Sequence, residues 1–433
     1  MMDKMNESHK VSLIILGAGG RGTIYANLVK LMPDRAQVVA VAEPRPFFRD
    51  RIANDHAIPP ENVFSDWHDV LKRPKFADAV VITTQDRMHV EPAVAFARKG
   101  YHILIEKPLA PDIDSCREIV RAVKENNVVL AACHVMRYAN YTRMLRHLIE
   151  NGSVGKIISV EHLEPVGHWR YAHSYVRGNW SREEDSSSVL LAKSIHDLDW
   201  IAYIVGQKCN AVTSFGSLMF FRHENRPKNA ADRCLDCPLE PECPYSAPRF
   251  YLERFRNKQI DNYIESVTGE LSEENILKAL REGPYGRCVF ACDNDVADHQ
   301  VVNMEFDGGA TAVFTLAGCS RYGERRTTIF GSAGEIRCDG CKIELYSYLR
   351  DRTTEINIEP DRGTLTTHHN GGDKYCLEAF VDALRTGDTS KIVSGADVSL
   401  ETHYMVFAAE MSRKEKRLVQ MDELRRAMPG TGR

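Results

Sequence analysis

The feature that most constrains this chain is an apolar segment that runs directly into a glycine-rich turn. Residues 11–16 (VSLIIL) form an apolar run bounded by glycine, as in a strand buried on both faces of a parallel sheet. The letters GAGGRG follow, with Gly17, Gly19 and Gly22 in the G-x-G-x-x-G spacing, and apolar residues then recur at helical intervals as far as Leu31. Strand, glycine turn and helix in this order predict a dinucleotide-binding unit.

Each glycine of the turn has a physical role in such a unit. Gly17 permits the tight turn, Gly19 lets the backbone approach a pyrophosphate, and Gly22 lets the helix pack closely. Because a helix N-terminus attracts phosphate groups, we expect Gly20 and Arg21 to line the same site. The alternative, a purely structural glycine turn, does not account for the second strand and acidic residue that follow.

That second strand (residues 37–43, QVVAVAE) ends at Glu43, twenty-one residues after Gly22. Glu43 can accept hydrogen bonds from a ribose 2′-hydroxyl, and its charge would repel a 2′-phosphate, so the sequence favours NAD. Arg45 lies two residues further on and could offset the repulsion, which leaves NADP open.

Strands and helices continue to alternate after this point. Residues 77–84, 101–108 and 128–134 read as strands, and residues 90–100 read as a helix that ends at a glycine. Repeated β-α-β units predict an α/β fold with a doubly wound parallel sheet, here a Rossmann domain over residues 1–135. Ligands bind beyond the carboxyl ends of such strands, where the letters LIEKP (104–108) place Glu106 and Lys107.

Length and composition narrow the class of protein. A chain of 433 residues is too long for one core, so two domains are expected, and 43% apolar with 27% charged residues is ordinary for a globular protein. A net charge of −4 suggests neither a nucleic-acid partner nor an anionic membrane surface. With no apolar stretch long enough for a bilayer and a polar N-terminus, the expected location is the cytoplasm.

The chain resembles the Gfo/Idh/MocA oxidoreductases, the glucose–fructose oxidoreductase and inositol dehydrogenase family. The matching segments are GAGGRG, residues 83–110 (TTQDRMHVEPAVAFARKGYHILIEKPLA) and SIHDLD (194–199), and a cysteine-rich insert marks a subgroup. The resemblance implies an α/β domain over residues 136–433, with a large, mostly antiparallel sheet that binds substrate and forms homo-oligomer contacts, as a dimer or tetramer. It also implies NAD(P)-dependent hydride transfer at a secondary alcohol of a sugar, sugar derivative or cyclitol.

The resemblance makes Lys107 the leading catalytic candidate and implies cofactor contacts from Thr84, His89, Glu106 and Lys107. Pro108 restricts Lys107 to extended backbone, which sets its direction. Partial burial next to an oxidised nicotinamide would lower the pKa of its ammonium group, so the amine could exchange a hydroxyl proton near neutral pH. A strand-edge salt bridge is the structural alternative.

A second catalytic segment is expected at residues 190–206 (LLAKSIHDLDWIAYIVG). His196 and Asp199 match the family pattern, and Lys193 lies one helical turn before His196. The acidic residue that often stands four positions before the histidine is Ala192 here, so we expect Lys193 to supply a polar function in its place. A structural role for His196 at a helix N-terminus is the alternative.

Two further segments resemble walls of a carbohydrate site. They are HVMRY (134–138), after the last Rossmann strand, and HWRYAHSYVRGNW (168–180), which is rich in aromatic and polar side chains. The predicted substrate-binding residues are His134, Arg137, His173, Arg177 and Trp180. Interdomain or oligomer contacts are the alternative for each. The segment HHNGGD (368–373), before the C-terminal helices expected from about residue 374, could bring another histidine to the site.

Twelve cysteines are many for a cytoplasmic chain, and several gather in an insert at about residues 222–298. Cys234, Cys237 and Cys243 are closely spaced around prolines, and Cys288 follows, with Cys292 as the reserve ligand. Four thiolates predict a closed structural zinc site that holds the insert folded. An iron–sulfur cluster also needs four cysteines, and free thiols or a disulfide remain alternatives.

Three functions remain open from the sequence. The leading one is a sugar or cyclitol dehydrogenase. The second is a redox-neutral NAD-dependent glycoside hydrolase or lyase, which the altered residue at 192 and the extra His and Lys residues would suit. The third is a non-enzymatic NAD(P)-sensing protein, against which Glu106, Lys107 and His196 argue.

Overall fold

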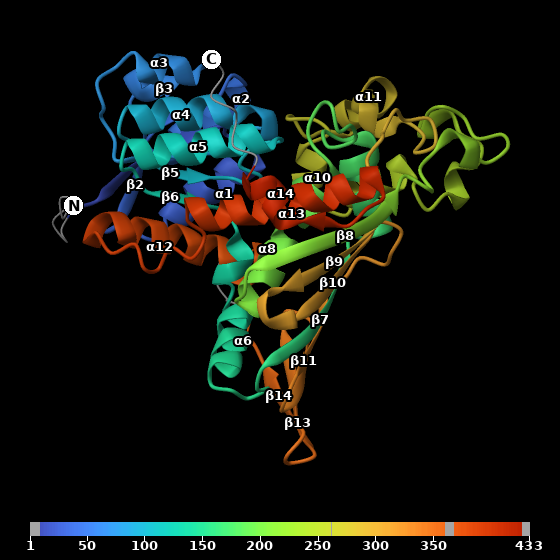
Figure 1. The fold of residues 1–433 in the computed structure, drawn as a ribbon. Coiled ribbons are helices and arrows are strands. Elements are labelled where there is room, and N and C mark those ends of the chain that lie inside the picture. The colour runs from blue at the N-terminus through green and yellow to red at the C-terminus, as the bar shows by residue number, and fades with distance from the viewer. Residues whose placement is uncertain (1–8, 261, 360–367, 427–433) are drawn as a thin grey trace, which may run out of the picture.

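The structure is a computed structural model that describes residues 9–260, 262–359 and 368–426. These residues form a six-stranded sheet early in the chain and a nine-stranded sheet later. Figure 1 draws the two sheets in separate regions, with long helices passing between them. The predicted fold class, a parallel sheet followed by a mostly antiparallel one, is confirmed.

The first sheet has the order β3-β2-β1-β4-β5-β6, and all of its neighbouring strands are parallel. The chain runs outward from β1 in one direction and then from β4 in the other, so the carboxyl ends of β1 and β4 flank a crevice. The strands are β1 (Val11–Leu16), β2 (Ala36–Ala42), β3 (Val63–Phe64), β4 (Ala79–Ile82), β5 (His102–Ile105) and β6 (Leu130–Ala132).

Helices cover both faces of this sheet. One apolar core joins one face to α1, α2 and α12, and another joins the opposite face to α3, α4 and α5. These helices are α1 (Gly20–Val29), α2 (Pro46–Asp55), α3 (Trp67–Leu71), α4 (Val90–Arg98), α5 (Ile113–Glu125) and α12 (Gly372–Thr386). The late helix α12 therefore completes the core around the first sheet (Figure 1).

The second sheet has the order β14-β13-β12-β11-β7-β10-β9-β8-β15. Its neighbouring strands are antiparallel except β7 and β10, which run parallel. The strands are β7 (Ile157–Pro165), β8 (Cys209–Ser217), β9 (His299–Phe306), β10 (Thr311–Ala317), β11 (Arg326–Gly331), β12 (Gly334–Cys338), β13 (Lys342–Ser347), β14 (Arg352–Asn357) and β15 (Val419–Gln420).

Helices α8 and α13 pack on this sheet, and α13 also contacts α5 of the first unit. The helices of this region are α6 (Asn140–Glu150), α7 (His168–Tyr171), α8 (Ile195–Val205), α13 (Ala396–Glu415) and α14 (Met421–Arg426). A π-helical turn at Leu190–Ser194 leads into α8. Such turns often occur at functional sites, and this one contains Lys193.

The insert between β8 and β9 has an apolar core of its own, with α9 (Arg254–Arg256), α10 (Asn262–Glu265) and α11 (Glu273–Glu282). Tyr251, Ile264, Ile276 and Leu280 are fully buried in it. The insert therefore has an apolar core of its own, because aromatic and aliphatic side chains spaced far apart in the sequence meet there.

Candidate active site

Two glycines of the turn, Gly17 and Gly22, have no room for a side chain. A Cβ atom on Gly17, whose φ is 86°, would lie 2.8 Å from the carbonyl oxygen of Thr83, and one on Gly22 would lie 2.0 Å from that of Gly17. The N-cap residue of α1, which begins at Gly20, is Gly19 and forms no side-chain cap hydrogen bond. Because the first N–H groups of a helix have no partner within it, this N-terminus suits binding of a pyrophosphate.

Glu43 ends β2 beside this turn and is almost fully buried. Its carboxylate accepts hydrogen bonds from the Ala18 amide (2.8 Å) and from Nε and Nη2 of Arg45 (2.7 and 3.0 Å). Burial by itself would raise the pKa of Glu43, but the bonds from Arg45 and Ala18 outweigh burial and lower it. Arg45 is thus held where the predicted 2′-hydroxyl site lies, with its guanidinium also against the Phe48 ring.

Arg21 connects the glycine turn to two distant acids. Its Nε donates to Glu106 at 2.5 Å, and its Nη2 contacts Asp373 at the start of α12. Because Glu106 also accepts from the Lys107 amide at 3.0 Å, Arg21 sets the position of the backbone that carries Lys107. Arg21 was expected to contact phosphate, and the structure places its guanidinium among these carboxylates.

Lys107 follows β5 and is partly buried, and its peptide bond to Pro108 is cis. Its Nζ donates to the carbonyl oxygen of Ala192 at 2.5 Å, which brings it to the π-helical turn before His196. Burial lowers the pKa of Lys107; Glu106 and Asp86 oppose this effect, and Arg21 and Arg170 add to it. An amine with a lowered pKa is suited to accept a proton near neutral pH.

Lys193 and His196 follow Ala192, whose carbonyl oxygen the Lys107 ammonium group contacts. Lys193 is buried and forms an ion pair with Glu164 at 2.9 Å, and burial lowers its pKa to about 8 despite that carboxylate. His196 is also buried, and no hydrogen bond to either of its ring nitrogens occurs among the described residues. Burial, followed by the charge of Lys107, lowers the pKa of His196 well below its usual value.

An acidic residue on β7, Glu164, pairs with Lys193. Glu164 bridges Lys193 to Arg325, whose Nε lies 2.7 Å from Glu164 and 2.5 Å from Asp197. Asp197 in turn pairs with His162 at 2.9 Å. Sequence reasoning missed Glu164 and Arg325 because neither lies near the SIHDLD motif, and no local pattern marks them.

The loop after β4 holds two of the expected cofactor residues. The ring nitrogens of His89, which is fully buried, lie 2.7 Å from the Pro108 carbonyl and 3.1 Å from the Thr84 carbonyl. His89 therefore connects the loop to the segment after Lys107. In the same loop, buried Asp86 accepts from Ser186 at 3.1 Å, a contact that sequence reasoning did not foresee.

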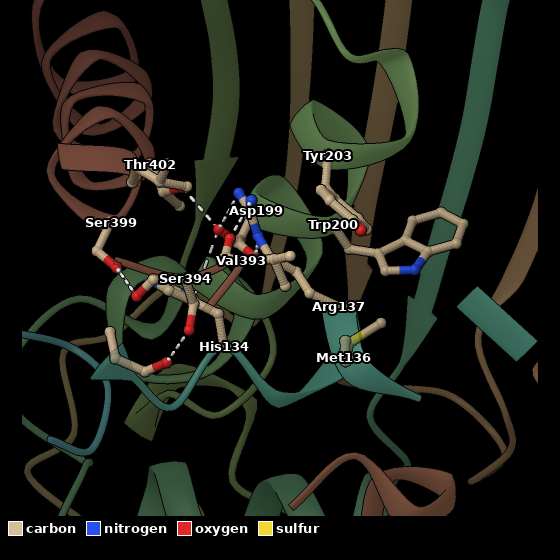
Figure 2. A network of polar contacts seen from close by, with 12 residues as sticks. His134, Met136, Arg137, Asp199, Trp200, Tyr203, Val393, Ser394, Ser399 and Thr402 are labelled. Atoms are coloured by element: carbon tan, nitrogen blue, oxygen red, sulfur yellow. Dashed lines mark hydrogen bonds and ion pairs between the residues drawn. The ribbon is translucent and has the colours of Figure 1, made fainter. Parts of the chain in front are cut away.

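Arg137 and His134 occupy a buried polar network (Figure 2). Arg137 donates to both carboxylate oxygens of Asp199, at 2.7 and 2.8 Å, and to the Val393 carbonyl at 2.9 Å. His134 is fully buried, and its Nδ1 lies 3.7 Å from Oδ1 of Asp199. Arg137 thus donates its hydrogen bonds to protein groups. This geometry favours a structural role, in which Arg137 joins β6, α8 and α13, over the predicted substrate contact.

Two other predicted substrate residues, Arg177 and His173, contact the insert. Arg177 donates to the carbonyl oxygens of Arg287 (2.7 Å) and Tyr245 (2.8 Å), and His173 lies 2.6 Å from the Tyr251 hydroxyl. Trp180 is 38% exposed. In the same segment Arg170, which sequence reasoning passed over, adds to the effect of burial, which lowers the pKa of Lys107 and of Lys193.

The structure does not support the predicted zinc site. Across residues 9–260, 262–359 and 368–426, no group of three or more His, Cys, Asp or Glu side chains is arranged to hold a metal ion. Cys234 is buried in the apolar core of the insert, where Arg177 donates to its sulfur at 3.4 Å. Cys237, Cys243 and Cys288 are free and partly buried. The insert is held together by its apolar core and by Arg177.

None of the helices in the described part of the chain has both the length and the apolar character that crossing a bilayer requires.

Two family models match the sequence. One, "Oxidoreductase family, NAD-binding Rossmann fold", matches residues 11–134, and the other, "Oxidoreductase family, C-terminal alpha/beta domain", matches residues 146–421.

Individual related proteins have low sequence identity to this chain. A myo-inositol 2-dehydrogenase from Thermotoga maritima is 24% identical over 95% of this chain and 98% of its own length. A 2,7-anhydro-N-acetylneuraminate hydratase from Escherichia coli is 30% identical over 47% of this chain and 53% of its own length. A levoglucosan dehydrogenase structure with NADH and levoglucosan shares the fold with a TM-score of 0.70 at 18% identity, over 95% of this chain and 100% of that one. With matches that span both of its sheets, the chain belongs to the Gfo/Idh/MocA family of NAD-binding oxidoreductases.

Proposed function

We propose that this oxidoreductase acts on a secondary alcohol carbon of a sugar, sugar derivative or cyclitol. The observation that carries the proposal is the contact of the Lys107 ammonium with the Ala192 carbonyl at 2.5 Å, which brings an amine of lowered pKa to the segment of buried His196. The myo-inositol and levoglucosan dehydrogenases among the related proteins act on this class of compound.

The glycine turn suits the phosphates of NAD, because Gly17 and Gly22 allow the backbone to turn closely and the N-cap residue Gly19 has no side chain to cover the helix N-terminus. When bound, NAD supplies the hydride acceptor. We assign its contacts to Gly17, Gly19, Gly20, Arg21 and Gly22 in the turn, together with Glu43, Thr84, His89, Glu106 and Lys107.

In this proposal Lys107 takes the hydroxyl proton as its neutral amine, and the lowered pKa makes that form accessible. His196 is neutral and keeps both ring nitrogens free of protein partners in the described residues, so it can orient the same hydroxyl. Lys193, whose pKa is about 8, provides a second exchangeable proton nearby.

A panel of polyols tests the proposal directly. Purified protein is incubated with NAD and with myo-inositol, levoglucosan or 2,7-anhydro-N-acetylneuraminate, while absorbance at the NADH band and loss of substrate are both followed. We expect NADH to form with at least one neutral polyol. Failure to consume any of them, in either redox direction, would contradict the proposed substrate class.

The same panel separates a second candidate, a redox-neutral reaction in which the hydride is returned to the product. Two observations favour keeping it: the related hydratase, and the presence of Lys193 as an additional proton-transfer group of lowered pKa. Loss of substrate without net NADH would support this second candidate over a simple dehydrogenase.

The preference for NAD over NADP is the next prediction. Glu43 both repels a 2′-phosphate and holds Arg45, so Glu43→Ala should remove the repulsion and free Arg45 to pair with that phosphate. We expect the parent protein to bind NADH more tightly than NADPH, and the substitution to narrow the difference about tenfold or more, since charge-assisted contacts contribute about 1.5–3 kcal/mol.

Fluorescence titration with both reduced cofactors measures this change. Glu61→Ala, which removes an exposed carboxylate in the following loop, is the control and should leave the ratio of the two affinities unchanged. Equal affinities for NADH and NADPH in the parent protein would contradict the role assigned to Glu43.

Other expectations from the sequence remain predictions. They are the division into domains at about residue 135, a homo-oligomer, and a cytoplasmic location. We propose them on the grounds given by the sequence, and sedimentation analysis of purified protein would test the oligomer.

A further inference from the structure

The segment before α12 brings a histidine to the catalytic groups from the far end of the chain. His369, Asn370 and Gly371 have φ values of 56°, 53° and 82° in succession. Non-glycine residues rarely adopt this left-handed conformation, and such backbone clusters at functional sites. Asn370 secures the turn by donating to the Gly340 carbonyl at 3.0 Å.

A carboxylate orients the imidazole of His369. Its Nδ1 lies 3.1 Å from Asp373, which is fully buried and also pairs with Arg21. Arg21 keeps Asp373 ionised: burial would raise the pKa of Asp373, but the charge of Arg21 and the hydrogen bonds from His369 and Arg21 lower it strongly. Nδ1 of His369 therefore donates to Asp373, and Nε2 is left as the nitrogen available to a ligand.

That imidazole faces the proposed catalytic histidine. The ring centres of His369 and His196 are 5.3 Å apart, and the side chain of His369 retains 24% of its exposure. Burial lowers the pKa of both imidazoles, so both are neutral near pH 7. Neutral imidazoles bind hydroxyl groups as donors or acceptors but do not attract an anion.

We propose that His369, oriented by Asp373, is a substrate-binding residue that holds the hydroxyl group next to the one held by His196. Two imidazoles this close to one another suit neighbouring hydroxyls on one ring, so the substrate class is a polyol with a vicinal diol at the oxidised carbon. The inference rests on the proposed function and adds a specificity determinant to it.

The test uses His369→Asn, because asparagine tolerates the left-handed backbone but is too short to reach the same hydroxyl. The probe is whichever polyol of the panel, myo-inositol or levoglucosan, the parent enzyme oxidises, together with its monodeoxy analogues. For the polyol we expect kcat/KM to fall about tenfold, which is the loss of one hydrogen bond. For the analogue that lacks the neighbouring hydroxyl, parent and variant should have the same kcat/KM.

Two controls accompany this variant. His68→Gln alters a histidine that also pairs with an aspartate, at 2.7 Å from Asp66, but on the surface beside β3, and it should change neither value. NADH affinity, measured by fluorescence, should be unchanged in both variants. His369→Gln, which keeps more of the side-chain volume, replaces His369→Asn if the latter does not fold.

The outcomes are distinct. If the parent protein oxidises no polyol, the proposed function fails and this inference falls with it. If the parent enzyme is active but the substitution lowers kcat/KM equally for the polyol and for every deoxy analogue, or lowers neither, then the assignment of His369 alone is wrong.

Discussion

Replacement of Lys107 by alanine is expected to lower kcat by about 10²–10⁴-fold, the usual contribution of a positioned general base. The affinity for NADH should stay within a few-fold, because the glycine turn and Glu43 are separate from the ammonium group. The amine lies 2.5 Å from the Ala192 carbonyl and beside His196, so its removal takes away the group that receives the hydroxyl proton. Single-turnover absorbance measurements with the active polyol check the chemical step.

Lys107→Arg separates proton transfer from charge. The guanidinium keeps a positive charge but does not lose its proton at accessible pH, so the loss of kcat should be nearly as large as for alanine. Lys124→Ala removes an exposed lysine that pairs with Asp397, and should have no effect. Parental turnover in Lys107→Ala would mean that this lysine is structural.

The pH dependence follows from the same pKa. Oxidation needs the neutral amine, so kcat/KM should rise with pH and level off once Lys107 is deprotonated. The midpoint of this rise should lie below the ordinary pKa of lysine, because burial and nearby arginines lower the pKa of Lys107. The rise should disappear in Lys107→Arg.

The second large effect concerns stability. Arg137→Met should lower the free energy of unfolding by about 3–5 kcal/mol, because Asp199 would be left buried without its cationic partner. The side chains of this pair are only 7% and 1% exposed, and Figure 2 shows the network that surrounds them. Chemical denaturation of the purified variant measures the change.

An ion pair on the surface with the same N···O distance is the control. Arg337 and Glu335 also lie 2.7 Å apart, but their side chains are 67% and 20% exposed. Arg337→Met should change the unfolding free energy by no more than about 0.5 kcal/mol. Similar losses in the two variants would contradict the importance given to burial.

The sign of the pH dependence gives an independent check. In the parent, burial would raise the pKa of Asp199, but Arg137 lowers it; the stabilisation is present above about pH 4 and is lost as the pH falls below that. Without Arg137, burial dominates and the folded-state pKa lies above the unfolded one. The deficit of Arg137→Met should therefore be larger near pH 7 than near pH 4.

Local patterns were sufficient for the first half of the fold. The apolar run at residues 11–16 is β1, no Cβ fits at Gly17 or Gly22 of the turn after it, and Lys107 lies just beyond the end of β5. These features depend on neighbours within a few residues and on the rule that parallel strands share their carboxyl edge.

Such local patterns did not reveal the partners of the proposed catalytic groups. Glu164 on β7 and Arg325 before β11 meet Lys193 because the strand order of the second sheet places β11 beside β7. His369 reaches His196 only because α12 packs back onto the first sheet. A carboxylate or imidazole has the same local signature wherever it finally lies, so its role is decided by long-range packing.

In the cysteine insert, a local pattern predicted a metal site that the structure does not support. The spacing of Cys234, Cys237 and Cys243 resembles that of metal ligands, yet Cys234 packs in an apolar core and accepts a hydrogen bond from Arg177. The sequence by itself determined that the chain carries an NAD-binding Rossmann fold with Lys107 just beyond the end of β5, since these features depend on contiguous backbone. Only the tertiary structure decided which charged groups surround the lysine and what holds the insert, because burial and pairing arise between segments that the sequence keeps apart.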